Sequence, residues 1–418
     1  MIDCLIIGAG PAGLMAASAL AQNGIKGEIW EKSPKPGLKL LITGKGRCNI
    51  TNARYASLED FLQNYNAGGR FLYSALNRFS PQDTMEFFAS RGLEVVVEQG
   101  GRVFPKSEKA RDVLDVQLKA AGPGFPIRTR RAVESINVVQ KAGEDRVFQV
   151  RSTSGHTQLA RCVIVAVGGA SYPKTGSTGD GVKLLSPLGH TFTKLRAGLV
   201  PLECSDDFIT EIQGLSLVNV EASLYVKGKK VFNELGEMVF THFGVSGPLI
   251  LSMSNNDFDS AEISIDLKPA LDHEKLDKRV QRDFDQYKNR DFKNALDDLL
   301  PQKLIPVIVR LSGIDPDRKV HSITRKERQG LVALLKDFRL HVTGKRPIDE
   351  AIVTLGGLNL KEIDPRTMES KLVSGLYVCG EMIDVSAVTG GYNLQAAFST
   401  GYLAGHSCAC KLLQAVVQ

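Results

Sequence analysis

Three glycines and one acidic residue near the N-terminus have the spacing of a dinucleotide-binding turn. Gly8, Gly10 and Gly13 form a G-x-G-x-x-G pattern directly after the apolar run 4–7, and Glu31 ends the next strand-like run. In such a turn the first glycine permits the tight bend, the second lets the backbone approach a pyrophosphate, and the third lets a helix pack closely on a strand. N–H groups at the helix start attract the anion, and the acidic side chain accepts hydrogen bonds from ribose hydroxyls. We predict a bound dinucleotide; a glycine turn that only packs the helix on the strand is the alternative.

A second group of residues, near the C-terminus, favours FAD over NAD. No second G-x-G-x-x-G follows a strand, so the chain offers no separate nicotinamide domain. An apolar run ends in Glu381, and a helical pattern begins shortly afterwards at Asn393 and Leu394. Glu381 could hold ribityl hydroxyls, and the N–H groups of Asn393 and Leu394 could face the pyrimidine edge of an isoalloxazine, where negative charge gathers on reduction. The alternative for Glu381 is a surface residue after a strand.

The stretch 43–52, with the sequence TGKGRCNITN, could serve several kinds of site. A Walker-type phosphate loop needs Gly-Lys followed by Ser or Thr and a helix, but here a glycine follows and no helical pattern comes after it. A zinc half-site lacks a second ligand at a usable spacing. We predict a loop that folds over the cofactor, in which Gly44 and Gly46 allow close approach and Arg47 offers charge to the pyrophosphate. Cys48 is then a wall of the flavin pocket, and a single-thiol role for it stays open.

The elements that must position these residues follow from the hydrophobic pattern. The N-terminus has the order strand, glycine turn, helix and strand, which is a βαβ unit with parallel strands. Residues 161–171 are apolar at consecutive positions, typical of a strand buried on both faces of the same sheet. Residues 197–267 alternate, which indicates an antiparallel sheet or small barrel, and 271–340 are helical and charged. A last helix is predicted over 393–413, so an α/β nucleotide-binding domain is built from both chain ends.

Composition limits the class of protein. The chain has 418 residues, enough for two or three domains, with 43% hydrophobic and 23% charged residues, as in ordinary globular proteins. The seven cysteines are scattered, without Cys-x-x-Cys or zinc spacing, so we expect reduced thiols and no metal site. No signal segment and no apolar run of about 20 residues is found. We expect a soluble cytoplasmic protein without a membrane segment.

The net charge of +6 comes from one segment. Residues 272–346 contain 18 lysines and arginines against 12 aspartates and glutamates, a difference equal to the whole net charge. Because both signs are interspersed and aromatic residues are sparse, we favour a mixed-sign helical surface over a nucleic-acid patch. A flavoprotein that acts on RNA through this segment is the alternative. The sequence leaves the oligomeric state open.

Six ordered motifs run from the first strand to the last helix. They are GAGPAG at 8–13, GKGRCNITN at 44–52, GRVFP at 101–105, GGASYPKTGSTGDG at 168–181, FTHFGVSGP at 240–248 and GEMIDVSAVTGGYNLQAA at 380–397. In these motifs the sequence resembles the bacterial BaiN-like or aminoacetone-oxidase-like family of FAD-dependent oxidoreductases. Lys45 departs from the family pattern, because many relatives carry another glycine there.

The resemblance implies a Rossmann-like, glutathione-reductase-type FAD-binding domain with an inserted antiparallel β-barrel domain and a small helical domain. We place the FAD-binding domain at 1–195 and 350–418, the barrel domain at 196–268 and 341–349, and the helical domain at 269–340. The implied cofactor is FAD, held tightly but without a covalent bond. Its contacts would fall on Gly8, Gly10, Ala12, Gly13, Glu31, Lys32, Gly46, Arg47, Cys48, Val133, Gly168, Gly380, Glu381, Asn393 and Leu394.

The resemblance implies the cofactor more closely than the reaction. Members resemble either amine and aminoketone oxidases or reductases of conjugated steroid enones, so we expect hydride transfer between flavin and a small organic substrate. NAD(P)H as a transient electron donor is left open. Candidates for substrate contact are Tyr172, Thr241 and His242, which stand beside glycines that would allow backbone approach to a flavin. For His242, capping or packing of the barrel is the alternative.

Overall fold

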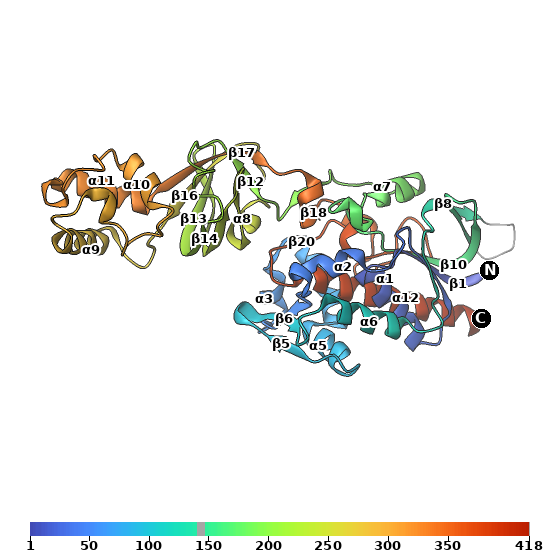
Figure 1. The fold of residues 1–418 in the computed structure, drawn as a ribbon. Helices are drawn as coiled ribbons and strands as arrows, with labels where there is room; N and C mark the ends of the chain where they lie inside the picture. The colour runs from blue at the N-terminus through green and yellow to red at the C-terminus, as the bar shows by residue number, and fades with distance from the viewer. Residues whose placement is uncertain (140–146, 418) are drawn as a thin grey trace. The chain divides into compact units, whose positions relative to one another are not determined.

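The computed structural model describes residues 1–139 and 147–417 and divides the chain into two compact units. The first unit contains Met1–Gly198 and Ile348–Gln418, and the second contains Leu199–Pro347. Both units are drawn in Figure 1. Both ends of the chain contribute to the first unit, and the second unit is an insertion in it.

A seven-stranded sheet forms the centre of the first unit. Its parallel strands are β1 (Ile2–Ile7), β2 (Gly27–Trp30), β7 (Ile127–Arg128), β10 (Thr157–Val165) and β19 (Leu376–Val378), and β8 (Val133–Val139) and β9 (Val147–Ser152) add an antiparallel hairpin. The order is β7-β2-β1-β10-β9-β8, and β19 pairs with the last residues of β10. Leu5, Ile164 and Val378 are fully buried, because the sheet is covered on both faces and its parallel strands are apolar throughout. The predicted buried strand over 161–171 is confirmed as far as Val165, where β10 ends, and residues 166–171 form the loop after it.

Helices α1 (Pro11–Gln22) and α12 (Tyr392–Val417) pack closely and join the two ends of the chain (Figure 1). A Cβ added at Gly401 would lie 2.3 Å from the carbonyl oxygen of Ala12, and one at Gly405 would lie 2.3 Å from that of Ala16. Residues four apart share one face of a helix, so these glycines let the two backbones touch. The sequence predicts the last helix over 393–413, and the structure extends it at both ends.

Shorter elements surround the sheet of the first unit. The helices are α2 (Leu38–Ile42), α3 (Leu58–Leu62), α4 (Tyr73–Arg78), α5 (Pro81–Ala89), α6 (Ala110–Ala121) and α7 (Asp180–Leu185). Three small sheets pair β3 (Thr51–Asn52) and β5 (Val95–Val97) with β6 (Arg102–Pro105), β4 (Tyr65–Ala67) with β20 (Ser386–Ala387), and β11 (Arg196–Gly198) with β18 (Val353–Leu355). The chain leaves the first unit after β11 and returns shortly before β18.

The second unit is a closed six-stranded antiparallel barrel with helices, which confirms the predicted insertion. The strands are β12 (Leu202–Cys204), β13 (Ser216–Val226), β14 (Lys229–Phe240), β15 (Gly244–Ser246), β16 (Ala261–Asp266) and β17 (Phe338–Lys345), and the helices are α8 (Pro248–Met253), α9 (His273–Gln286), α10 (Ile305–Ser312) and α11 (Arg325–Lys336). One apolar core joins barrel and helices; the rings of Phe208 and Phe338, for example, lie 5.5 Å apart. β17 includes residues that the sequence analysis gave to the helical domain, and the finer domain division stays a proposal.

Within residues 1–139 and 147–417, every helix is too short or too polar to span a lipid bilayer. No group of three or more histidines, cysteines, aspartates or glutamates in the same residues is arranged to hold a metal ion. The cysteines described are all free thiols.

Replacing Gly401 with alanine should destabilise the first unit. The added Cβ would push two helix backbones apart, and such overpacking costs about 1–3 kcal/mol. Gly330 in α11 is the matched control, because its added Cβ would meet no atom within 4 Å and alanine is favoured over glycine in a helix by about 0.8–1 kcal/mol. Thermal unfolding should show a lower Tm for Gly401→Ala and an equal or higher Tm for Gly330→Ala. The reverse order would contradict the close packing of α1 and α12.

Candidate flavin site

The G-x-G-x-x-G turn exposes backbone at the start of α1. Gly8 has a φ of +104°, and a Cβ there would lie 2.4 Å from the carbonyl oxygen of Ala166. A Cβ at Gly13 would lie 2.0 Å from the carbonyl oxygen of Gly8, so the third glycine is needed for helix–strand packing. A Cβ at Gly10 would meet no atom within 4 Å, and Gly10 precedes α1 without a side-chain cap. A ligand can therefore approach the backbone beside the first N–H groups of α1, including that of Ala12, which attract anions.

Glu31 is held at the end of β2 against this turn. Its carboxylate accepts hydrogen bonds from the N–H groups of Ala9 at 2.8 Å and Ser33 at 2.7 Å, one on each oxygen. Each oxygen keeps a second lone pair, so the carboxylate can also accept from ribose hydroxyls. The segment before Val133 also contacts Glu31. The N–H of Arg131 donates to the carbonyl oxygen of Glu31 at 2.8 Å. The structure thus brings Glu31 to the glycine turn and brings Arg131, two residues before Val133, to Glu31.

The ammonium of Lys32 has protein partners. It donates to Asp180 at 2.6 Å and to the hydroxyl of Thr178 at 2.5 Å. This ion pair ties the end of β2 to the motif at 168–181. A cofactor contact of Lys32 would use its backbone or would replace these partners.

The loop at 43–52 has an unusual left-handed backbone. Gly44, Lys45 and Gly46 have successive φ values of 56°, 58° and 87°. A left-handed conformation costs a non-glycine residue roughly 1–2 kcal/mol, so the position of Lys45 would suit the glycine that the family pattern has there. A Cβ at Gly46 would meet only the carbonyl oxygen of Leu41, at 4.0 Å. The backbone at Gly46 is therefore open to close approach.

Arg47 is already paired within the protein. Its guanidinium forms ion pairs with Glu98 and, at 2.9 Å, with Glu108, and it lies 4.2 Å over the ring of Phe104. These contacts join the loop to the GRVFP motif. The buried Nε of Arg47 and the buried Oδ1 of Asn49 have no hydrogen-bond partner in the described structure. The predicted interaction of Arg47 with a pyrophosphate would thus use Nε, because Glu98 and Glu108 both bind Nη2 of the guanidinium.

Cys48 is a neutral, buried thiol. Its side chain is fully buried, its φ is +63°, and burial raises its pKa to about 12. A thiol reacts as the thiolate, so at neutral pH the side chain is in its unreactive form. This agrees with a structural role in the loop and gives no support to a nucleophile.

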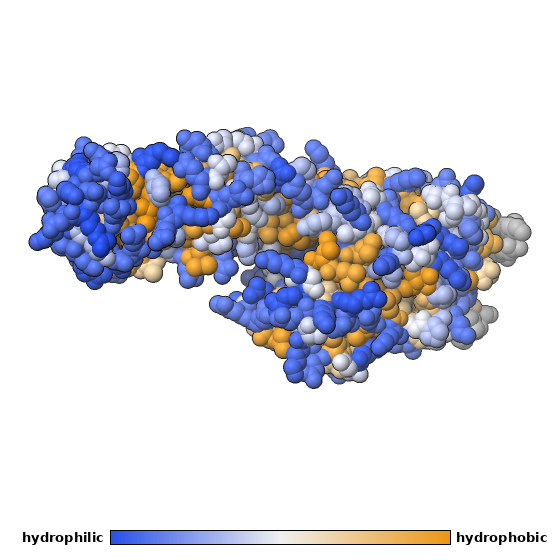
Figure 2. All heavy atoms as spheres, viewed as in Figure 1, coloured by the Kyte–Doolittle hydropathy of each residue, from blue (hydrophilic) through white to orange (hydrophobic). Residues whose placement is uncertain are grey.

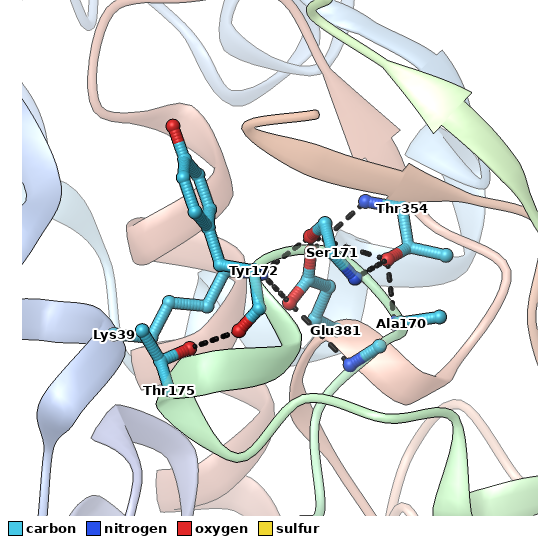
Figure 3. A network of polar contacts seen from close by, with 8 residues as sticks. Lys39, Ala170, Ser171, Tyr172, Thr175, Thr354 and Glu381 are labelled. Atoms are coloured by element: carbon cyan, nitrogen blue, oxygen red, sulfur yellow. Dashed lines mark hydrogen bonds and ion pairs between the residues drawn. The ribbon is translucent and has the colours of Figure 1, made fainter. Parts of the chain in front are cut away.

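The carboxylate of Glu381 is the centre of a polar network (Figure 3). Oε2 accepts from the ammonium of Lys39 at 2.6 Å and from the N–H of Gly169 at 3.4 Å. Oε1 accepts from the N–H of Thr354 at 2.9 Å and from the hydroxyl of Ser171 at 3.3 Å. Lys39 also donates to Ser171 at 2.7 Å. The network joins α2, the loop after β10, β18 and the 3-10 turn at 380–382, which are distant in the sequence.

Four donors fill the accepting capacity of a carboxylate. Glu381 therefore fixes the neighbouring loops, and the ribityl contact predicted for it would require one of these donors to be displaced. Gly168, with φ +76°, and Gly380, with φ +78°, lie in the same loops, and a Cβ at Gly380 would be 2.8 Å from the Cβ of Ala12. The turn at 380–382 thus touches the start of α1.

The start of α12 lies against the loop at 43–52. Thr51 donates to the side chain of Gln395 at 2.6 Å, and Asn52 donates to the carbonyl oxygen of Gly390 at 3.0 Å. The side chain of Asn393 accepts a hydrogen bond from the N–H of Ala387 at 3.0 Å and donates one to the carbonyl oxygen of Ala387 at 3.1 Å. The backbone N–H groups of Asn393 and Leu394 are in the first turn, where an α-helix supplies no partner for them.

The three candidates for substrate contact lie in different units. Tyr172 lies next to the Glu381 network, with a strained φ of +53°, and its ring points away from Glu381 in Figure 3. Thr241 and His242 are in the turn between β14 and β15 of the second unit. His242 is exposed, and the buried hydroxyl of Thr241 has no partner among the described residues. Tyr172 therefore belongs to the unit that carries the predicted cofactor contacts, and Thr241 and His242 belong to the other unit.

The residues of the first unit fit FAD. Gly10 and Gly46 offer open backbone, Arg47 Nε and Asn49 Oδ1 are buried polar atoms without partners, and Glu31 keeps free lone pairs. A dinucleotide needs these groups: helix N–H groups for the pyrophosphate and a carboxylate for a ribose. The individual contacts to FAD stay predictions.

Sequence reasoning missed the partners of Glu381. Lys39, Ser171 and Thr354 belong to three separate segments, and no spacing rule connects them. Gly37, with φ +66° before α2, is the one local signal, because its N–H bonds to the carbonyl oxygen of Ala9 and sets α2 beside the glycine turn. An ion pair between residues 342 positions apart can be seen only in the fold.

Replacing Arg47 with alanine should lower the flavin content more than replacing Cys48 with serine. The first change removes three loop contacts and a candidate pyrophosphate donor, whereas the second keeps the size of a buried side chain. Flavin per polypeptide, measured by absorbance after purification, checks the order. A larger loss in Cys48→Ser would return the cysteine to the centre of the site.

The comparisons with known proteins agree with this geometry. The model of the HI0933-like protein Rossmann domain matches residues 2–407. The chain is 31% identical over 414 residues to a ribosomal RNA dihydrouridine synthase of Escherichia coli strain K12, covering 99% of this chain and 98% of that protein. It is 30% identical over 414 residues to a 3-dehydro-bile acid delta(4,6)-reductase of Clostridium scindens, covering 97% of this chain and 98% of that protein.

Solved structures share the fold at low sequence identity. An open flavocytochrome c3 fumarate reductase matches with a TM-score of 0.52 and 16% identity, covering 99% of this chain and 78% of that chain. A quinol-fumarate reductase matches with a TM-score of 0.52 and 18% identity, covering 99% of this chain and 72% of that chain. The family match spans nearly the whole chain, so this protein belongs to the HI0933-like family of Rossmann-domain flavoproteins and is an FAD-dependent oxidoreductase.

Proposed function

We propose that this protein is a reductase that saturates a carbon–carbon double bond conjugated to a carbonyl group, and that its substrate is uridine in RNA. The observation that carries the proposal is the full-length similarity to two kinds of reductase. One is named for dihydrouridine in ribosomal RNA and the other for a bile-acid double bond. The C5=C6 bond of uracil and the double bond of an enone are both conjugated to a carbonyl, so one chemistry serves both.

The reduction adds one hydride and one proton across the double bond. FAD, when bound in its reduced form, supplies the hydride, and NAD(P)H is proposed as the external donor that loses it. The residues of this chain would hold the cofactor through the start of α1, Glu31 and the loop at 43–52. The second requirement is an acid that gives a proton to the carbon next to the carbonyl group.

Tyr172 is our candidate for that acid. Its hydroxyl has no hydrogen-bond partner in the described structure, and its backbone is held in a strained left-handed conformation of the kind that clusters at functional sites. The N–H groups of Ala170 and Ser171, just before it, donate to the hydroxyl of Thr354 at 2.8 and 3.1 Å. These bonds fix the backbone that carries Tyr172 while leaving its phenol available.

RNA is preferred here over a small organic substrate, which reverses the preference of the sequence analysis. A second relative named as a ribosomal RNA dihydrouridine synthase, from Haemophilus influenzae, is 32% identical over 401 residues. The excess positive charge of residues 272–346 gives this preference independent support, because RNA binding needs cations for phosphate groups. Reduction of a steroid-like enone is the second candidate, favoured by the bile-acid reductase, and oxidation of an aminoketone is the third.

A product assay tests the proposed substrate. Purified protein with FAD and NADPH should convert uridine to dihydrouridine in an unmodified ribosomal RNA transcript. Nuclease digestion and mass spectrometry would detect the gain of two hydrogen atoms by the base. Parallel reactions contain a steroid enone or aminoacetone instead of RNA. Turnover of either compound, with RNA unchanged, would overturn the choice of uridine.

Removing the Tyr172 hydroxyl should slow the reduction without loss of flavin. Because one positioned acid contributes typically 10²–10⁴-fold, we expect Tyr172→Phe to lower kcat by roughly 100-fold or more. The control is Tyr73→Phe at an exposed tyrosine of α4, which should keep wild-type activity. Flavin content of both variants is measured with kcat. Normal turnover by Tyr172→Phe would show that the proton comes from elsewhere.

A further inference from the structure

Resting on the proposed function, we propose that an exposed basic surface at one end of α9 and α11 binds the phosphate backbone of the RNA substrate. The basic surface consists of Lys288 and Arg290, after α9, and of Arg325 and Lys326, in the first turn of α11. All four side chains are exposed. The space-filling view shows a hydrophilic face over the helices of this unit (Figure 2).

Backbone hydrogen bonds bring the two halves of the basic surface together. The N–H of His321 donates to the carbonyl oxygen of Lys288 at 3.1 Å, and the N–H of Val320 donates to that of Arg290 at 3.1 Å. The segment that holds Val320 and His321 leads directly into α11. The loop after α9 and the start of α11 therefore form one end of the helical part.

The start of α11 is fixed by further polar contacts. Thr324 and Glu327 form a reciprocal capping box. The guanidinium of Arg318 donates to both carboxylate oxygens of Glu327, at 2.6 and 2.8 Å. The backbone that carries Arg325 and Lys326 is thus held in place before any ligand binds.

The side chains of the basic surface differ from most other lysines and arginines of the helical part. Eleven lysines and arginines of residues 272–346 form ion pairs with carboxylates: Lys275, Lys278, Arg279, Lys293, Arg310, Arg318, Lys319, Arg328, Lys336, Arg339 and Arg346. Among the described residues, the four cations of the basic surface have no ion pair of this kind; outside it, Arg282 and Lys303 also have none. The mixed-sign surface expected from the sequence therefore describes most of the segment, while free positive charge gathers at this end.

Helix electrostatics gives an independent argument. The N-terminus of a helix carries a partial positive charge, so cations in its first turn are unfavourable. Arg325 and Lys326 occupy the first two positions of α11. They oppose the helix dipole and form no ion pair of 4.0 Å or less with a carboxylate, whereas a phosphate group would be attracted by both cations. A polyanion is therefore the partner that these side chains fit.

The other aromatic and acidic groups near the surface are compatible with RNA. The guanidinium of Arg290 lies 4.3 Å over the ring of Tyr287, which leaves it partly available at the edge of the loop. Asp277 is bound by Arg328 at 2.8 Å, and Asp291 is bound by Lys319. The ion pairs of these two carboxylates are thus made with cations outside the basic surface.

The test compares two triple variants of equal charge in the full-length holoprotein. The first variant removes three positive charges from the basic surface through Lys288→Gln, Arg325→Gln and Lys326→Gln. The control variant removes three positive charges from α9 through Lys275→Gln, Lys278→Gln and Arg282→Gln. Binding of an unmodified ribosomal RNA transcript is measured at several salt concentrations. The first variant should bind about tenfold or more weakly at low salt, and its log–log salt slope should fall by roughly 2, since each phosphate contact contributes about 0.7–0.9.

The control variant should keep a slope within about 1 of the wild type. Replacing Arg325 and Lys326 should leave the Tm unchanged or raise it, so lost binding cannot be attributed to unfolding. Equal loss of RNA binding in both variants, or no loss in the first variant, would overturn the proposal that the basic surface binds RNA. Loss of binding to anionic phospholipid vesicles, with RNA binding unchanged, would assign it to a membrane and also overturn the proposal.

Dihydrouridine formation separates this inference from the proposed function. If wild-type protein forms no dihydrouridine under any condition, the proposed function fails and the basic surface loses its substrate. If wild-type protein forms dihydrouridine and the first triple variant does so with unchanged KM for RNA, the proposed function stands and the basic surface is wrong. The expected result is a raised KM with kcat nearly unchanged, because the surface binds RNA away from the reacting atoms.

Discussion

The carboxylate of Glu381 holds the first unit in the form that the proposed chemistry needs. It receives donors from Lys39 of α2, from the loop after β10 and from Thr354 of β18. Removal of one partner from such a network leaves the other polar groups partly buried and unpaired, which costs more than the net gain of each bond. The loop at 43–52 follows α2, and α12 follows the turn that carries Glu381. The position of both predicted flavin-binding segments therefore depends on this one side chain.

The insertion of the second unit is linked to the same network through the chain. The chain leaves the first unit after β11 and returns before β18, and these two strands pair with each other. Thr354 lies in β18 and both donates to Glu381 and accepts from the loop before Tyr172. The strand that closes the insertion therefore also fixes the loop that carries the proposed acid. In the second unit, barrel and helices share one core, which gives the basic surface a rigid support.

Local patterns in the sequence predicted the fold better than the site. The glycine turn, the apolar run at 161–171 and the alternating segment at 197–267 depend on short-range spacing, and the structure has the corresponding turn, strand and barrel. The pairing of Lys39 with Glu381 depends on the final fold, and so do the ion pairs that take up the charge of Arg47. The net charge of residues 272–346 can be counted from the sequence. The sequence does not show which of their lysines and arginines pair with carboxylates. Contacts between side chains of distant segments thus cannot be predicted from spacing in the sequence.

The central claim is that electrons pass from a pyridine nucleotide through bound FAD to a conjugated double bond in RNA. Anaerobic absorbance measurement tests it most directly. Addition of NADPH should bleach the flavin bands, and subsequent addition of unmodified ribosomal RNA, without oxygen, should restore them. The flavin bands should return with unmodified RNA and should stay bleached with RNA whose uridines are already reduced. A flavin that stays bleached with RNA and recovers only with a steroid enone or oxygen would contradict it.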